Sequence, residues 1–163
     1  MRQILELLER DATVTPETLA TMIDQPVEEV RAQIAAWERS GAIRRYRAVV
    51  DWDAVDDDTT RETVTAFIDV SITPARGVGF DDVAGRIARF DEVRSVYLVS
   101  GSQDLRCTVT GSTIRAVSDF VSQKLSTIDR VRSTATHFVL KTYKRDGDAF
   151  QTPEPDHRLP VTP

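Results

Sequence analysis

The residues best suited to bind a small molecule lie between two predicted strands, from Ser100 to Asp104. Gly101 lets the chain turn through positive φ and leaves nearby backbone amides accessible. Such amides can hold a carboxylate, while the Asp104 carboxylate can hold an ammonium group, so the turn suits a zwitterion. This interpretation makes Ser100, Gly101, Ser102 and Asp104 candidate binding residues. Taken alone, the segment also fits an ordinary hairpin in which Asp104 satisfies its own turn.

The sequence around the turn predicts a compact α+β domain over residues 62–145. Apolar residues alternate over 64–72, in the hairpin 93–110 and in a last strand from about 130 to 141, as in half-buried strands. Helical spacing of apolar residues appears over 80–90 and from Ser112 or Thr113 to 128. The resulting order, β-α-β-β-α-β, is that of a ferredoxin-like unit.

In such a unit both helices cover one face of the sheet. The other face is predicted to carry Phe67, Tyr97, Val99 and Phe138, or their neighbours, depending on the register of the strands. Because this face is too apolar for open solvent, the sequence predicts a homodimer in which a second chain covers it.

The first 50 residues predict three short helices. Ile4, Leu5, Leu7 and Leu8 give the first helix, over 2–10, an apolar side. Thr15 can cap the second helix, and Asp24-Gln25-Pro26 breaks it before a third helix that ends at Ser40-Gly41. Three helices with a short break between the last two fit a helix-turn-helix of the winged-helix-like kind, although a plain helical bundle would give the same pattern.

Basic residues beyond the third helix favour the DNA-binding interpretation. Arg44, Arg45 and Arg47 can contact backbone phosphates of double-stranded DNA. On the third helix, Arg31 and Gln33 are the polar residues expected to face the groove. Glu28 is unfavourable near phosphates unless it accepts from a cytosine amino group, and Glu29 shares this difficulty.

Composition limits the remaining possibilities. The net charge of −5 gives no overall attraction to nucleic acid or to an acidic membrane. Without an apolar run of membrane-spanning length or a signal-peptide core, we expect a cytoplasmic protein. The single Cys107 is expected to be a reduced core thiol. Two distant histidines and no Cys-x-x-C spacing predict no metal site, and the sequence predicts no cofactor.

The predicted organisation has four parts. Residues 1–50 form the helix-turn-helix domain, with 45–50 a strand that leaves it, and 51–61 form an acidic linker. Residues 62–145 form the ferredoxin-like domain. Residues 146–163, rich in Gly, Asp and Pro, form a tail that is not expected to pack.

This arrangement resembles the Lrp/AsnC (feast/famine) family of transcriptional regulators, over roughly residues 2–145. The matching segments are Leu19-Ala20, Val30, Glu38, Gly41-Ala42-Ile43 before Tyr46, Val93 to Asp104 with its Gly-x-x-Asp, and Ser133 to Phe138. The resemblance implies dimers formed through the sheets and assembled into larger rings, with the third helix on DNA. It also implies an amino acid or similar effector held between dimers by the Ser100–Asp104 loop, with Thr134 and Thr136 nearby.

Two alternatives remain open at this point. Pro26, Ala32 and Gln33 depart from the family pattern and, together with Glu28 and Glu29, are consistent with an assembly protein that binds a ligand but little DNA. The two-domain arrangement also resembles that of siroheme decarboxylases, enzymes that act on a tetrapyrrole through His and Arg side chains. His137 and Arg106 are the candidates for such an enzyme, although a lone strand histidine is more often structural.

Overall fold

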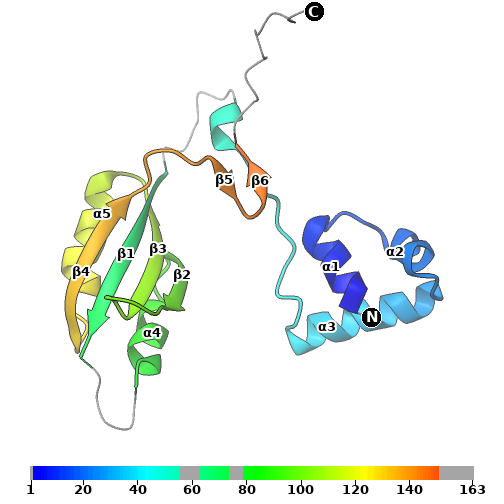
Figure 1. The fold of residues 1–163 in the computed structure, drawn as a ribbon, viewed down its shortest axis with the longest axis horizontal. Helices are drawn as coiled ribbons and strands as arrows, with labels where there is room; N and C mark the ends of the chain where they lie inside the picture. Colours follow the sequence, from blue (N-terminus) through cyan, green and yellow to red (C-terminus); the bar gives the residue numbers. More distant parts are fainter. Residues whose placement is uncertain (1, 56–62, 74–78, 151–163) are drawn as a thin grey trace, which may run out of the picture. The chain divides into compact units, whose positions relative to one another are not determined.

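The computed structural model of the chain describes residues 2–55, 63–73 and 79–150. They fold as two compact units, residues 1–50 and residues 51–163, each with its own apolar core. Figure 1 shows that the first unit is helical and that the second contains the sheet. Within the described ranges, no helix is long and apolar enough to cross a membrane.

The first unit consists of α1 (Arg2–Arg10), α2 (Pro16–Ile23) and α3 (Val27–Ser40). Their facing sides bury Ile4, Leu19 and Val30 completely. The predicted helix ends are confirmed. The Thr15 hydroxyl accepts from the amide of Thr18, and Gly41 ends α3 at a φ of 74°, a conformation that glycine adopts without steric cost.

The strand predicted over 45–50 is absent, and residues 44–50 have no regular secondary structure. Alternating apolar residues predict an extended chain, but a strand also needs a neighbouring strand to pair with. A short 3-10 helix, η1 (Trp52–Ala54), begins the second unit. Most of the predicted acidic linker, residues 56–61, lies outside the described residues.

The second unit contains a four-stranded antiparallel sheet, which confirms the predicted β-α-β-β-α-β order. Its strands are β1 (Val64–Ile72), β2 (Val93–Leu98), β3 (Leu105–Gly111) and β4 (Val131–Phe138), arranged in the order β2-β3-β1-β4. The helices are α4 (Asp81–Ile87) and α5 (Ile114–Phe120), the latter continued by a π-helical turn, η2 (Val121–Leu125).

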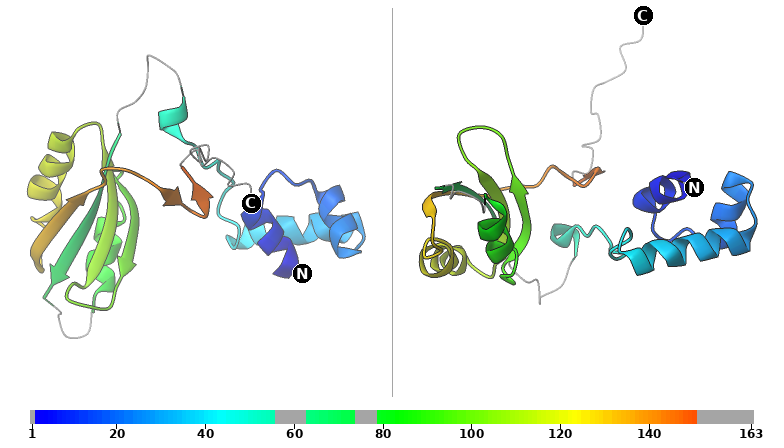
Figure 2. Two further views of the ribbon diagram at one scale, coloured as in Figure 1. Left: turned by 45° about the horizontal axis from the view of Figure 1, so that its top comes forward. Right: turned by 90° about the horizontal axis from the view of Figure 1, so that it is seen from below.

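Both helices pack on the same face of the sheet (Figure 2). On that face every second residue of β1 is buried, including Ala66, Ile68 and Val70, and the helices contribute Val83 and Val117. The intervening β1 residues, among them Phe67 and Asp69, therefore lie on the other face, called here the open face.

The register of β4 decides which of two neighbouring residues lies on the open face. Phe138 pairs with Ala66 of β1, so it lies on the helix-covered face and packs against the core rather than on the open face. His137, which pairs with Phe67, takes the open-face position instead. A shift of one residue exchanges the two faces of a strand, and the alternation of β4 alone did not determine that shift.

The chain beyond β4 is also more ordered than predicted. Strands β5 (Lys144–Arg145) and β6 (Asp148–Ala149) pair as a small hairpin through the turn at Asp146-Gly147, so the first residues of the predicted tail are structured. The Lys141 ammonium lies 5.2 Å from the Tyr143 ring centre, and the Arg145 guanidinium lies 4.5 Å from that of Phe150. Residues 151–163 lie outside the described residues.

Cys107 gives a first testable prediction. It lies on β3 with no exposed surface, and burial raises the pKa of its thiol to about 11. Because only the thiolate is nucleophilic, we expect the folded protein to resist a disulfide reagent at pH 8 and to react once unfolded in urea. A stoichiometric reaction of the folded protein within minutes would contradict the buried position.

Candidate functional site

A cavity of about 540 Å³ lies in the second unit, beside the connection between β2 and β3. Most of its wall is polar main chain and side chain, with two apolar residues at one side. Its lining residues are Asp69, Leu98, Val99, Ser100, Gly101, Ser102, Gln103 and Arg106. The predicted turn is therefore part of a cavity, and residues of β1 and β3 complete it.

The charged part of the cavity is an ion pair between β1 and β3. Arg106 Nε and Nη2 donate to the two carboxylate oxygens of Asp69, at 2.7 and 2.9 Å. These hydrogen bonds hold the pKa of Asp69 below its ordinary value, against the opposing effect of burial. On the other side of Asp69, His137 Nε2 lies 3.6 Å from Oδ2.

Sequence reasoning missed Asp69 as a cavity residue. It is a nearly buried charged residue, 7% exposed, within a strand whose other buried residues are almost all apolar. A charged residue within a predicted apolar strand was the signal in the sequence, because a buried carboxylate requires a partner. The structure supplies that partner in Arg106, which lies directly opposite Asp69 on β3.

The turn residues 100–103 form one wall of the cavity. Gly101 has a φ of 134°, and a Cβ atom at this position would meet no other atom within 4 Å, so the chain there is open to a ligand. Ser100, Gly101 and Ser102 are exposed. The Ser71 hydroxyl donates to Gln103 Oε1 and so fixes the amide side chain of Gln103 at the edge of the cavity.

Asp104, which the sequence predicts to bind the effector, is not among the residues that line this cavity. Its Oδ2 accepts from the backbone amide of Ile72 at 2.7 Å, and its own amide donates to the carbonyl of Val70 at 3.1 Å. The carboxylate thus extends the pairing of β1 with β3 by taking the place of a backbone carbonyl. This geometry corresponds to the simpler interpretation of the segment, in which Asp104 stabilises the turn.

Thr134 and Thr136 are also not brought to the cavity. They pair with Val70 and Ile68, which are completely buried beneath the helices. Directly opposed residues share a face, so both threonines lie on the helix-covered face, whereas the Asp69–Arg106 pair lies on the open face.

The residues predicted to contact DNA lie on α3 and just beyond it. Glu28 and Arg31 are exposed on α3, and Gln33 is half-buried. The Arg31 guanidinium pairs with the carboxylate of Glu17, which lies in the first turn of α2. The sequence alone does not reveal this pair, since a partner 14 residues away gives no local signal.

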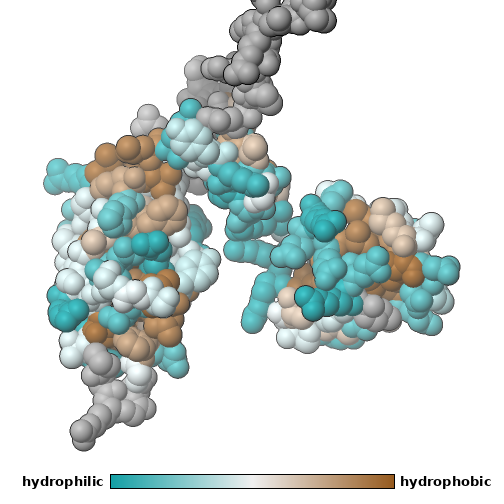
Figure 3. Space-filling view, in the orientation of Figure 1, coloured by the Kyte–Doolittle hydropathy of each residue, from teal (hydrophilic) through white to brown (hydrophobic). Residues whose placement is uncertain are grey.

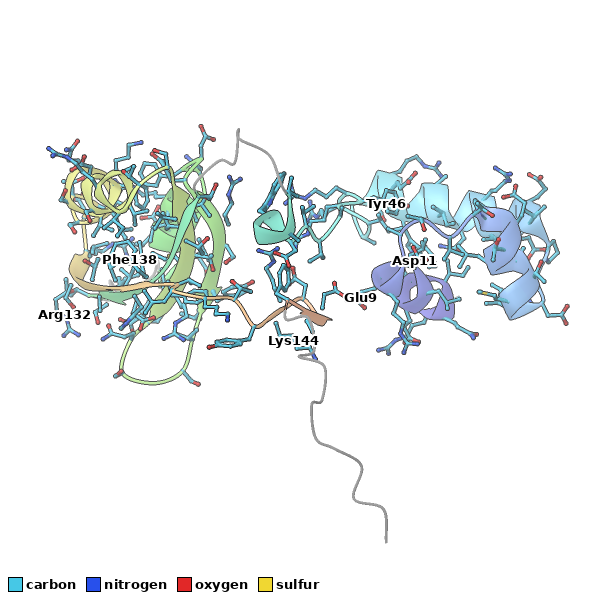
Figure 4. All side chains as sticks on the ribbon, turned by 90° about the horizontal axis from the view of Figure 1, so that it is seen from above. Glu9, Asp11, Tyr46, Arg132, Phe138 and Lys144 are labelled. Carbon is cyan, nitrogen blue, oxygen red and sulfur yellow. The ribbon has the colours of Figure 1, made fainter. Side chains whose placement is uncertain are left out.

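The basic residues after α3 are exposed, as the phosphate-binding interpretation requires. They are Arg44, Arg45 and Arg47. Tyr46, labelled in Figure 4, donates its hydroxyl to Glu38 Oε1 at 3.0 Å and so holds this segment against the end of α3. The described residues contain no group of three or more His, Cys, Asp or Glu side chains that could hold a metal ion.

Comparison with known proteins identifies the family. The model of the Lrp/AsnC ligand-binding domain matches residues 65–149. An uncharacterized HTH-type transcriptional regulator of Bacillus subtilis, YugG, is 50% identical over 161 residues, which are 99% of this chain and 95% of that protein. The chain belongs to the Lrp/AsnC family. The resemblance seen in the sequence is therefore confirmed, and the protein is an HTH-type transcriptional regulator.

More distant family members support the same conclusion. The HTH-type transcriptional regulator LrpA of Mycobacterium tuberculosis is 29% identical over 145 residues, which cover 89% of this chain and 91% of LrpA. A transcriptional regulator of Neisseria meningitidis in complex with L-methionine aligns with a TM-score of 0.66 at 25% identity, over 87% of this chain and 88% of that one. A feast or famine regulatory protein of M. tuberculosis complexed with L-methionine aligns with a TM-score of 0.68 at 26% identity, over 92% and 96% of the two chains.

The residues named for a decarboxylase are close together in this fold. Arg106 and His137 lie on opposite sides of Asp69, and both approach its carboxylate. The Arg106–Asp69 pairing is bidentate, so it occupies both carboxylate oxygens. Arg106 and His137 thus share Asp69 as a structural partner. The relatives described above are named as transcriptional regulators.

Proposed function

We propose that this Lrp/AsnC regulator binds double-stranded DNA through α3 and the segment after it, and responds to a free amino acid bound at the cavity beside residues 100–103. The observation that carries the proposal is the cavity itself, which the exposed turn residues 100–102 line together with the paired Arg106 guanidinium and Asp69 carboxylate. Related regulators of N. meningitidis and M. tuberculosis were solved with L-methionine, which supports an amino acid as the class of effector.

The two charged groups of an amino acid have matching partners at this site. The α-carboxylate accepts from the amides of the turn and from the N–H groups of Arg106 that do not face Asp69. The ammonium donates to Asp69, because a carboxylate has about four acceptor positions and Arg106 occupies two of them. Asp69 therefore replaces Asp104 as the proposed ammonium partner. Ser100, Gly101 and Ser102 keep their proposed role, whereas Thr134 and Thr136 have none in a single chain.

A screen of the twenty amino acids by thermal shift tests this part of the proposal. A ligand that binds only the folded state raises the apparent stability by mass action, so at about a hundred times Kd the stabilisation is about 2.7 kcal/mol. We expect one amino acid, or a few of similar shape, to raise the melting temperature in a saturable way. Equal melting curves with all twenty at millimolar concentration would contradict an amino-acid effector.

The open face is the proposed dimer interface. Phe67 and Tyr97 are 43% and 59% exposed there, and a second chain packed on this face would bury both aromatic side chains. Figure 3 shows apolar areas between hydrophilic ones on the unit that contains the sheet. A second copy of the chain would cover this face in a homodimer, and larger oligomers would assemble from such dimers. We place the regulator in the cytoplasm, with its DNA.

The arginines after α3 are proposed to contribute affinity without sequence preference. Replacing Arg44, Arg45 or Arg47 with Ala should weaken binding to all duplexes alike and flatten the dependence of log K on log salt by about one unit per lost phosphate contact. Fluorescence anisotropy across a salt series measures both quantities.

The control is Arg89→Ala, which removes an exposed arginine from the second unit. It should leave the salt slope unchanged. A change of preference at a single base pair in one of the three variants would make that arginine a base reader instead. A shallow salt slope for the unaltered protein would favour the assembly protein that binds little DNA.

A further inference from the structure

The ion pair between Arg31 and Glu17 joins the two helices of the helix-turn-helix. Arg31 lies on α3, the helix proposed to enter the groove, and Glu17 lies in the first turn of α2. Their side chains remain 51% and 56% exposed, so both can be reached by a bound duplex.

The pairing leaves part of the guanidinium available. Only Nη2 of Arg31 contacts Glu17, through a single carboxylate oxygen. A guanidinium has five N–H donors in a planar fork, and guanine requires two of them for its O6 and N7 atoms. The ion pair therefore fixes the direction of the side chain without using up the donors that read a base.

A carboxylate at this position also affects which part of DNA the arginine contacts. Phosphates surround a helix in the major groove, and an unrestrained guanidinium is attracted to the nearest one. Glu17 repels those phosphates and competes with them for Arg31. Because exposed ion pairs contribute little to folding stability, the main effect of this pair is on whether Arg31 contacts a phosphate or a base.

We propose that Glu17 is a positioning residue that directs Arg31 toward base edges and away from phosphates, and so raises the sequence preference of the regulator at the expense of its total affinity. This inference rests on the proposed DNA contact of α3. Glu17 itself need not touch a base.

The test compares two duplexes by fluorescence anisotropy with the full chain. One is selected by the unaltered protein from a pool of random duplexes, and the other is a scrambled sequence of the same composition. We expect Glu17→Gln to bind the scrambled duplex more tightly, with a salt slope steeper by about 0.9, because Arg31 gains a phosphate contact. The preference for the selected duplex should fall about tenfold, as expected when one bidentate base contact is lost.

The matched control is Glu6→Gln. Glu6 has the same side-chain exposure of 56% and pairs with Arg2 on α1, so this variant makes the same change in charge away from α3. Glu17→Asp, which keeps the charge in the first turn of α2, should restore part of the preference. In the Arg31→Gln background, replacing Glu17 should no longer change the preference.

Each of the following results would overturn the inference while leaving DNA binding intact. They are equal effects of Glu17→Gln and Glu6→Gln, an undiminished preference in a Glu17→Gln variant that melts normally, and an effect of Glu17→Gln that persists without Arg31. If Glu17→Gln melts at a lower temperature than the unaltered protein, Glu17→Asp takes its place in the test. A Glu17→Asp variant with as little sequence preference as Glu17→Gln would also overturn the inference. Lack of salt-dependent binding by the unaltered protein would remove the proposed function and this inference together.

Discussion

Replacing Arg106 with Lys should lower the affinity for the amino-acid effector about tenfold to a hundredfold. The ammonium of Lys keeps the charge but cannot span both oxygens of Asp69 while donating to a bound carboxylate, as the planar guanidinium does. A charge-assisted hydrogen bond contributes about 1.5–3 kcal/mol, which corresponds to this loss of affinity. Calorimetric titration with the amino acid that gives the largest thermal shift measures it, beside a melting curve of the variant.

Asp104→Asn is the matched control in the same turn. Its side-chain oxygen can still accept from the amide of Ile72, and Asp104 does not line the cavity, so effector affinity should remain nearly unchanged. The opposite outcome, in which Asp104→Asn lowers affinity while Arg106→Lys does not, would return the ammonium site to Asp104.

The second large effect is expected at the open face. Phe67→Asp should convert the dimer to a monomer of 18.2 kDa at micromolar concentration. Phe67 lies on β1 between β3 and β4, and covering an aromatic ring contributes about 2 kcal/mol or more at an interface. A carboxylate in its place would also be buried without a partner when a second chain packs against it. Sedimentation velocity over a range of concentrations measures the change.

Ile114→Asp provides the comparison for this variant. Ile114 is 58% exposed at the start of α5, where a carboxylate suits the helix end, so this protein should remain dimeric. If Ile114→Asp separated the chains and Phe67→Asp did not, the helix-covered side of the unit would carry the interface.

Local features of the fold were predictable because their physical causes are local. The cap at Thr15, the left-handed end at Gly41 and the alternation of β1 each depend on neighbours within a few residues. Their combination gave the helix-turn-helix and the ferredoxin-like order. The prediction of a strand over 45–50 was wrong because a strand must pair with another strand, which is distant in the sequence.

The site was predictable only in part for the same reason. The glycine turn identified the location, but the partner of Asp104 is the amide of Ile72, 32 positions earlier in the chain. The register of β4 decided that Thr134 and Thr136 face the helices and that His137 reaches Asp69. Contacts between distant strands and helices, such as Asp69 with Arg106 and Glu17 with Arg31, leave no periodic signal in either partner's neighbourhood.

The most direct test joins the effector to the DNA. The affinity of the full chain for a duplex that it selects from a random pool should be measured by anisotropy, at one salt concentration, with and without the amino acid that stabilises the protein most. An effector that binds two states of the protein unequally shifts their populations. We therefore expect the effector to change the DNA affinity fivefold or more, about 1 kcal/mol of coupling. In the Arg106→Lys variant the same change should require a higher effector concentration. An affinity for DNA that is the same at zero and at saturating concentrations of every stabilising amino acid would contradict an amino-acid-responsive regulator.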